Sequence, residues 1–397
     1  MVYVIQRQTK IAKLFSRNVM SKKKSEKIIV QVIDPFTEFN DVKGIWISLI
    51  EKCPHPYHLS WGWIEVWINS LNIDCGLKLV VYFKDQSPIV AFFIGSKIET
   101  YNRYFNFHKL SLNQTLIPEI DIVTYIEYNT ILVDPDTTIS LELFLDLIPV
   151  KSWDELELRR YFMYQDKFNF NITGNKYIVT MVKQYSYYVE LDKVRNNKNN
   201  YFSLVSNNRR KQILRAIREY EKIGEIQVCI AENEGEALKI FHELTALHQE
   251  RWTNRGYKGT YSTEYSIKFH ESLITQRFKY GEIQLMRISA GQQTIGCSYN
   301  YIYKNKVYTI SGGFNYLPEN YFQPGFVCDY YGIMHNTELG LQFYDFMENE
   351  AEYKKSLSTN YNSIYSIHII RNSAKYRIWK FTVWLYQMLV RTKPETR

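Results

Sequence analysis

Residues Gly281–Lys355 read GEIQLMRISAGQQTIGCSYNYIYKNKVYTISGGFNYLPENYFQPGFVCDYYGIMHNTELGLQFYDFMENEAEYKK, the strongest structural signal in the chain. Their pattern predicts two strands joined as a hairpin, a strand over Val307–Ser311, a loop, a helix, and a last strand that ends in an acidic turn. The helix is expected to begin at Pro324, because proline has no backbone N–H to leave unsatisfied there. This order places a helix N-terminus beside a sheet, where backbone N–H groups favour an anionic ligand.

An internal repeat links this stretch to the N-terminal half of the chain. Leu77–Gly95 (LKLVVYFKDQSPIVAFFIG) and Ile283–Tyr301 (IQLMRISAGQQTIGCSYNY) align without gaps, and each reads as a strand, a polar turn and a second strand. An aromatic segment with a helical pattern precedes each of them. A single hairpin could match by chance, but the shared context favours two copies of one unit. We therefore expect an α/β fold of two tandem domains, each with a mixed central sheet flanked by helices.

The expected domain boundaries follow composition. The polar stretch Asp192–Asn200, or the strand before it, marks the junction between the two domains. We expect a basic flexible tail over residues 1–27, an N-terminal domain over 28–190, a C-terminal domain over 191–360, and a basic amphipathic helix over 361–397.

Charge and cysteine usage restrict the function classes. The formal charge of the 397 residues is +8, but residues 1–27 hold eight cations and one acid, which leaves about +1 for the rest. Strong nucleic-acid binding is therefore not expected of the folded body. The five cysteines are widely spaced and form no Cys-x-x-Cys pair, which favours a reduced, cytoplasmic chain. No apolar run reaches the length of a membrane span, and no signal core opens the sequence.

Several polar residues precede the strongest signal in the chain. Asn208 and Arg209 lie in the first turn of a helix that Ser206 caps, where side chains can face a cleft. The basic residues further along this helix form either a solvated face or a polyanion contact. His248 and Trp252 lie one helical turn apart and share a face, with Arg251 between them. A histidine in such a place can be a base, a cap or a core residue.

The ends of the two strands around Pro324 are the other candidate positions. The pair Gly312-Gly313 indicates a bulge, or the close approach of another backbone or of a ligand. The acidic turn contains Asp345, Glu350 and Tyr353: a carboxylate there can accept a proton from an amine, and a tyrosine hydroxyl can protonate a thiolate. The same turn could equally be a solvent-exposed polar turn. Because the histidines and cysteines show no ligand spacing, no metal site is expected.

The C-terminal segment Tyr365–Val390 has the pattern of one amphipathic helix with cations around an apolar stripe. The stripe can dock on the protein's own body. It can also lie on an anionic membrane surface, to which the basic tail would add.

Residues 206–358 resemble the acyltransferase domain of CelD-like proteins, within the N-acetyltransferase (GNAT) superfamily. The matching motifs are Ser206–Ala216 (SNNRRKQILRA), His248–Gly256 (HQERWTNRG), Tyr321–Gly325 (YFQPG) and Tyr344–Leu357 (YDFMENEAEYKKSL). The N-terminal half resembles the degenerate first GNAT-like domain of the same family and of the Fem-like aminoacyltransferases. This sequence departs from the pattern at Met347-Glu348-Asn349, where the family places a glycine, and it lacks the superfamily's usual pyrophosphate loop.

The resemblance implies an acyltransferase that moves an acetyl or longer acyl group from a thioester, such as acyl-CoA, to an amine or hydroxyl acceptor. It implies Glu350, Asp345 and Tyr353 as catalytic residues. It places the donor at Gly312, Gly313, Tyr321, Pro324 and Gly325, and the acceptor at Asn208, Arg209, His248, Arg251, Trp252 and Lys354. Envelope sugar or lipid precursors are acceptors in such families. Two alternatives remain: an aminoacyl-tRNA-dependent transferase of the Fem-like kind, and a binding protein that keeps the fold without the chemistry.

Overall fold

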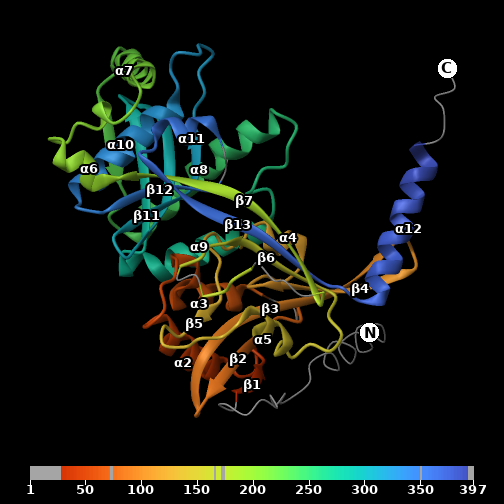
Figure 1. The fold of residues 1–397 in the computed structure, drawn as a ribbon. Coiled ribbons are helices and arrows are strands. Elements are labelled where there is room, and N and C mark those ends of the chain that lie inside the picture. Colours follow the sequence, from red (N-terminus) through yellow and green to blue (C-terminus); the bar gives the residue numbers. More distant parts are fainter. Residues whose placement is uncertain (1–27, 72–74, 165–166, 171–174, 349–350, 392–397) are drawn as a thin grey trace. The chain divides into compact units, whose positions relative to one another are not determined.

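The structure is a computed structural model and describes residues 28–71, 75–164, 167–170, 175–348 and 351–391. These residues form two compact units, which Figure 1 draws with their helices and strands labelled. The first unit lies within Met1–His55, Leu71–Lys183 and Tyr365–Arg397, and the second consists of Pro56–Ser70 and Gln184–Ile364.

The second unit is built on a mixed sheet with the strand order β8-β9-β10-β11-β12-β7. Neighbouring strands are antiparallel except for β11 and β12, which are parallel. The strands are β7 (Tyr177–Glu190, of which 184–190 belong to this unit), β8 (Ile226–Ile230), β9 (Ile283–Ala290), β10 (Gln293–Tyr303), β11 (Lys306–Phe314) and β12 (Phe343–Glu348). The expected hairpin is therefore confirmed as β9 and β10, with Gly291 at a positive φ in its turn.

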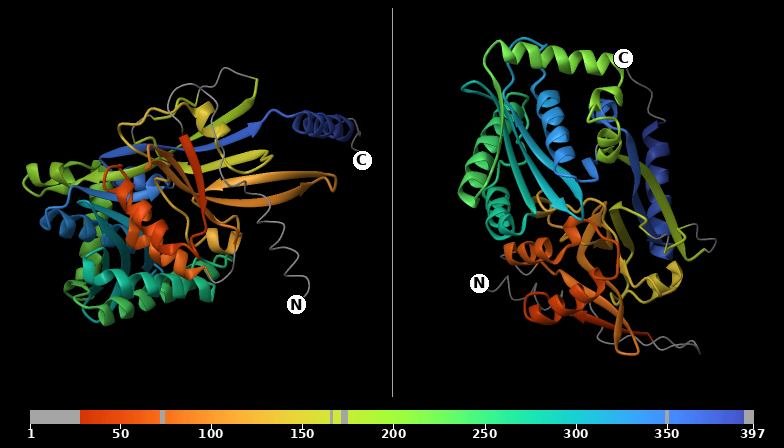
Figure 2. Two further views of the ribbon diagram at one scale, coloured as in Figure 1. Left: turned by 90° about the horizontal axis from the view of Figure 1, so that it is seen from below. Right: turned by 90° about the vertical axis from the view of Figure 1, so that its left-hand side faces the viewer.

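Helices cover both faces of this sheet (Figure 2). Phe241 of α8 and His270 of α9 both contact the Tyr299 ring of β10, so these two helices share one face. Helix α10 lies on the other face and begins at Pro324, as expected. The helices are α3 (Trp61–Ser70), α6 (Leu191–Asn196), α7 (Asn207–Glu221), α8 (Glu234–Thr253), α9 (Glu264–Arg277), α10 (Pro324–Glu338) and α11 (Glu352–Leu357), with 3-10 turns η1 (Tyr57–Leu59), η2 (Tyr201–Ser203) and η3 (Phe278–Tyr280).

The first unit repeats this arrangement. Its strand order is β1-β2-β3-β4-β6-β13, and β4 with β6 is its parallel pair. Trp46 of α2 contacts Phe93 and Phe144 of α5 contacts Phe92, so helices lie on both faces. The elements are β1 (Ile28–Ile33), α2 (Phe39–Ile50), β2 (Lys78–Lys84), β3 (Ser87–Tyr101), β4 (Phe105–Leu112), α4 (Pro118–Asp121), β5 (Leu132–Val133), α5 (Leu141–Asp146), β6 (Glu155–Tyr161) and β13 (Asn360–Arg371, of which 365–371 belong to this unit). The fold is thus α/β with two related units, each a mixed sheet flanked by helices.

The compact units differ from the contiguous domains expected from composition. Pro56–Ser70 belongs to the second unit, where the Tyr57 hydroxyl donates to the Glu282 carboxylate (3.0 Å). Arg277 donates two further hydrogen bonds, of 2.8 and 2.6 Å, to the same carboxylate. In the first unit, residues 365–371 pair with β6. These contacts join segments far apart in sequence, which a reading of local composition does not detect.

The C-terminal helix begins later than expected. Residues 365–371 are strand, and α12 runs over Ala374–Arg391. The reason is burial: Ile367 and Ile369 pack into the core of the first unit, where β-branched side chains favour a strand. Trp379 packs on Tyr101 and Phe107, with ring centroids 5.8 and 5.4 Å apart.

Candidate functional site

The parallel strands β11 and β12 separate toward their carboxyl ends. Their described pairing joins Lys306, Val307 and Tyr308 to Phe343, Tyr344 and Asp345. Beyond these pairs β11 continues through a bulge, seen as a register shift against β10, and β12 turns at Met347, where φ is 62°. We call the region between residues 309–314 and 346–348 the strand fork. Ligands of α/β proteins commonly bind outside the carboxyl ends of parallel strands.

One face of α10 is turned toward the strand fork. A Cβ atom at Gly325 would lie 3.6 Å from the Phe314 ring of β11, and one at Gly332 would lie 2.7 Å from the Tyr344 hydroxyl of β12. Asp329 lies four residues after Gly325 and three before Gly332, so it shares this helical face. Asp329 therefore lies on the face of α10 that meets β11 and β12.

Asp329 has unusual surroundings for an acid. It is partly buried, and among the described residues no hydrogen bond or ion pair joins its carboxylate to a partner. Burial raises the pKa of Asp329 to about 7, although the Lys354 ammonium acts in the opposite direction. Burial, strengthened by the Asp329 charge, also raises the pKa of the Tyr201, Tyr344 and Tyr353 hydroxyls. Titratable groups with such perturbed pKa values are concentrated at functional sites.

Sequence reasoning missed Asp329 because it considered the strand ends and the helix N-terminus, not the second turn of the helix. The available signal was spacing: an acid four residues after Gly325 and three before Gly332, on the face that glycines leave open to the sheet.

Three arginines surround the start of α10, each stacked on an aromatic ring. The guanidinium carbon of Arg209 lies 3.9 Å from the Phe326 ring centroid, and that of Arg251 lies 3.7 Å from the Tyr316 centroid. Arg215 lies 4.9 Å from the Tyr321 centroid. We call Arg209, Arg215 and Arg251 the arginine rim. Phe326 belongs to the first turn of α10, and Tyr316 and Tyr321 to the loop before it, so the rim brings positive charge to the start of a fifteen-residue helix.

In the structure, the contacts of Asp345 are typical of a residue that stabilises the fold. Its side chain is fully buried and pairs with the Lys306 ammonium at 2.6 Å. The Ser186 hydroxyl and the Met347 backbone N–H donate to the same carboxylate at 2.9 and 2.8 Å. These contacts favour a role in holding the end of β12. Glu350, the other acid expected to take part in catalysis, lies outside the described residues.

The remaining expected residues belong to α11, α8 and α7. Lys354 is buried and donates to the carbonyls of Met347 and Glu348, while Tyr353 is 43% exposed. His248 contacts Trp252 and Tyr261, and burial lowers its pKa. Asn208 is exposed on α7.

The glycine pair at the end of β11 has a packing reason. A Cβ atom at Gly313 would lie 2.2 Å from the Leu244 carbonyl oxygen of α8. This confirms the expected close approach of another backbone. A contact of Gly312 and Gly313 with a donor stays a prediction.

The corresponding place in the first unit is filled by the chain itself. There β4 and β6 pair in parallel through Lys109–Ser111 and Glu155–Glu157. Beyond them the Asn113 amide donates to Asn129 (2.7 Å), and Asn129 donates to the Leu112 carbonyl (3.1 Å) and bridges to Tyr161. In the first unit, side-chain and bridge contacts of Asn129 therefore join the chain beyond the last parallel pair of β4 and β6.

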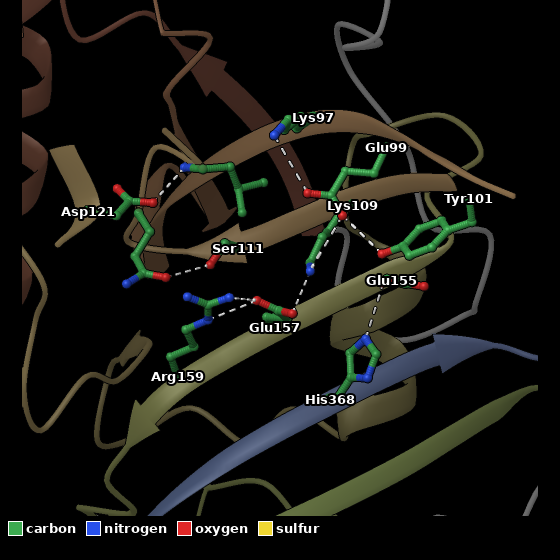
Figure 3. A network of polar contacts seen from close by, with 12 residues as sticks. Lys97, Glu99, Tyr101, Lys109, Ser111, Asp121, Glu155, Glu157, Arg159 and His368 are labelled. Carbon is green, nitrogen blue, oxygen red and sulfur yellow. Dashed lines mark hydrogen bonds and ion pairs between the residues drawn. The ribbon is translucent and has the colours of Figure 1, made fainter. Parts of the chain in front are cut away.

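Figure 3 shows that polar groups near this filled place satisfy one another. Glu157 lies 2.7 Å from both the Lys109 ammonium and the Arg159 guanidinium. Burial alone would raise the pKa of Glu157, but the two cations outweigh it and hold the pKa below its usual value. Such a paired network indicates structural support, and the strand fork of the second unit remains the candidate site.

This part of the chain is similar to a known protein family. Residues 207–355 match the family model described as an acetyltransferase (GNAT) domain. This part of the chain is therefore similar to a GNAT domain. The matched residues include the strand fork, Asp329 and the arginine rim, so the candidate site lies inside the part of the chain that is similar to a GNAT domain. No curated protein matches the chain.

Several solved structures resemble the chain at low identity. The crystal structure of FemX is 11% identical with a TM-score of 0.47, and the match covers 85% of this chain and 97% of that one. The C-terminal domain of a putative lysylphosphatidylglycerol synthetase from Agrobacterium fabrum is 9% identical with a TM-score of 0.45, covering 87% and 96%. A tandem GNAT protein from the clavulanic acid biosynthesis pathway is 9% identical with a TM-score of 0.43, covering 87% and 99%.

Two other features are absent from the described residues: a membrane-spanning helix and a group of metal ligands. None of their helices combines the length and the apolar character needed to cross a membrane. Within the same residues, no three or more histidine, cysteine, aspartate or glutamate side chains are grouped so that they could hold a metal ion.

Proposed function

We propose that the second unit transfers an acyl group from a thioester donor, such as acyl-CoA, to an amine or hydroxyl acceptor. The observation that carries this proposal is that the GNAT match includes both the strand fork, where the parallel pairing of β11 and β12 ends, and the N-terminus of α10. The donor phosphates would bind at the N-terminus of α10 between the cations of the arginine rim.

The chemistry would be a direct attack of the acceptor on the thioester carbonyl carbon. A backbone N–H near Gly312-Gly313 would hold the carbonyl oxygen, an interaction worth about 2.7–4 kcal/mol in comparable sites. Tyr353 would give a proton to the thiolate that leaves, because a tyrosine hydroxyl is protonated at neutral pH and the pKa of Tyr353 is raised further. The resemblance to CelD-like proteins supports an envelope sugar or lipid precursor as the acceptor.

We also propose that α12 brings the protein to an anionic membrane surface from a cytoplasmic location. Ile378, Phe381, Leu385 and Met388 lie on one helical face, and their side chains are 38–56% exposed. The residues of α12 include Lys375, Arg377, Lys380 and Arg391 and no acid. An apolar face beside cations is typical of helices that lie in the membrane interface.

A thermal-shift experiment tests the acyltransferase proposal. Acetyl-CoA should raise the melting temperature, since a ligand at 100 times its Kd stabilises by about 2.7 kcal/mol. Gly325→Trp should abolish the shift, because the indole would fill the space in front of α10. Gly44→Trp is the matched control, since a Cβ atom there meets nothing within 4 Å.

Two other results of the acetyl-CoA experiment would contradict the acyltransferase proposal. If acetyl-CoA gives no shift but tRNA binds with a steep salt dependence, an aminoacyl-tRNA-dependent transferase becomes the better assignment. A shift without any thiol release on a panel of amino sugars and lipids would identify a binding protein.

A further inference from the structure

We propose that β8 is the contact surface of a symmetric dimer, in which the β8 strands of two copies pair antiparallel about Val228. The partner is therefore a second copy of this chain. The proposal concerns an edge of the second sheet that the acyl transfer does not use, so it holds or fails independently of the proposed function.

Strand β8 lies at the end of the strand order of the second unit. Within the described residues β9 is its only partner strand, and their register runs from Ile226 to Ile230 without a bulge. The five residues of β8, IQVCI, contain neither a charge nor a proline. Edge strands of natural proteins usually carry a lysine, a proline or a bulge that blocks pairing with another chain. Strand β8 has none of these, which favours pairing along its free edge.

The hydrogen bonds at the two ends of β8 show which of its backbone groups face outward. The Gly291 N–H donates to the Glu225 carbonyl (2.9 Å), and the Ala231 N–H donates to the Leu285 carbonyl (3.0 Å). In an antiparallel pair, the residues that bond to the neighbouring strand alternate along it, so the odd-numbered residues of β8 bond to β9. The residues whose N–H and C=O groups point away from β9 are therefore Ile226, Val228 and Ile230.

An antiparallel pair centred on Val228 gives every one of these outward groups a partner. Val228 then lies opposite Val228 of the second copy as a hydrogen-bonded pair, and Ile226 lies opposite Ile230 of the second copy. The same strand is used by both copies, so the contact closes on itself and adds no third copy.

The side chains of β8 are suited to the same pairing. Ile226 and Ile230 pack partly against the core of the second unit. Val228 lies between them on the same face of the strand and is 37% exposed. Pairing would continue this apolar face from one copy to the other and would cover Val228.

The charges that flank β8 are complementary in this register. Lys222 lies four residues before the strand and Glu234 four residues after it, so the pairing places Lys222 level with Glu234 of the second copy. The Lys222 side chain is 69% exposed, although it also pairs with Glu219 of its own helix. Glu225 falls opposite Ala231 of the second copy, and so no acid is set opposite an acid. Opposite charges at corresponding positions favour this register over others.

Sedimentation equilibrium of the full chain between about 1 and 200 µM tests the proposal, because one short strand from each copy makes a small interface, which is typical of weak complexes. The parent protein should change from monomer to dimer within this range. Val228→Pro should raise the Kd of the dimer at least about tenfold, since proline removes the outward N–H and leaves the bonds to β9 in place. Val228→Ala keeps the backbone groups and is the matched control, which should still dimerise.

A charge exchange separates loss of the contact from damage to the fold. Val228→Lys and Val228→Glu should each be monomeric, because the two-fold axis places like charges opposite each other. An equimolar mixture of the two variants should dimerise again, since unlike charges then meet. A misfolded variant would not be restored by mixing, so this result remains decisive even if Val228→Pro does not fold.

Oxidation of an introduced cysteine tests the register. In a Cys229→Ser background, which removes the exposed thiol of β8, Val228→Cys should form a disulfide between copies, because hydrogen-bonded pairs have Cα atoms about 5.5 Å apart. Gln227→Cys in the same background is the control and should cross-link less, because its counterpart lies on the diagonal at about 7–8 Å.

Several results would overturn the proposal. They are a parent protein that stays monomeric over the whole concentration range, a Val228→Pro variant that folds and dimerises like the parent, and a mixture of the charged variants that stays monomeric. The α12 double variant Phe381→Asp with Leu385→Asp should dimerise like the parent. Loss of the dimer in that variant would place the contact on α12 instead of β8.

Discussion

At the residue scale, two acids of the second unit have opposite environments. Asp345 is buried with three partners, whereas Asp329 has none among the described residues. Asp345 belongs to one of the sequence motifs quoted above, and Asp329 belongs to none of them. Pairing depends on which side chains the fold brings together, and Ser186 lies 159 positions from Asp345 along the chain. Local sequence could therefore locate the acidic turn, but it could not tell a structural acid from a reactive one.

The pKa of Asp329 makes stability depend on pH. Its folded-state pKa of about 7 lies above that of an unfolded aspartate, so its contribution to stability is complete below about pH 4 and is lost as the pH rises to 7. Asp329→Asn should therefore melt higher than the parent at pH 8, by roughly 2–4 °C for each kcal/mol regained, and show no such gain at pH 4. Melting curves at both pH values measure this. An equal gain at both, or a lower melting temperature at pH 8, would contradict the assignment.

Lys306→Met should destabilise the protein through Asp345. Removing one partner of a buried ion pair leaves an uncompensated charge, at a cost of about 3–5 kcal/mol. Urea unfolding of the variant measures the loss in free energy of unfolding. Lys304→Met, at an exposed position two residues earlier, is the matched control and should change the free energy by less than about 0.5 kcal/mol. Similar small losses in both variants would mean that Asp345 does not need its partner.

At the element scale, the sequence predicted best where local patterns and turn residues agreed. The β9–β10 hairpin and the start of α10 follow from alternation, Gly291 and Pro324. Strand β13 could not be predicted from local patterns, because its isoleucines fit a helical stripe as well as a strand. Pairing with β6 decides between the two, and that partner lies about 200 positions earlier.

The exposed face of α12 makes the membrane proposal testable. Vesicles that contain phosphatidylserine should sediment the protein, and pure phosphatidylcholine vesicles or high salt should not. Phe381→Asp with Leu385→Asp should weaken binding by at least roughly tenfold, because each side chain buries apolar area worth about 1.5–3 kcal/mol. Gln387→Asp, at an exposed position on another face of the helix, is a control for added negative charge. Undiminished sedimentation of the double variant would show that the apolar face is not the contact.

At the scale of the whole molecule, the sequence repeat correctly predicted two related sheets. It did not reveal how the units differ beyond their parallel strand pairs, where the Asn113–Asn129 pair joins the chain in the first unit and β12 turns at Met347 in the second. Both hairpins look alike in sequence, and the difference arises from the connection that follows them. The first unit has short helices there, and the second has the fifteen-residue α10.

The uneven distribution of charge predicts the effect of removing residues 1–27. Deletion lowers the formal charge from +8 to about +1 and should reduce retention on heparin. The acetyl-CoA melting shift should stay the same, because the strand fork and the arginine rim belong to the second unit. Calorimetry with and without acetyl-CoA measures this, and loss of a cooperative transition would show that the tail is needed for folding.

Strand β13 has a further consequence for how the protein is made. It completes the sheet of the first unit by pairing with β6, yet it follows β6 by some 200 positions. At a synthesis rate of about 5–20 residues per second, the open edge of β6 would wait roughly 10–40 s on the ribosome for its partner strand. The half of the chain that emerges first is thus finished last, and a nascent chain stalled before residue 365 exposes an edge on which other chains could pair.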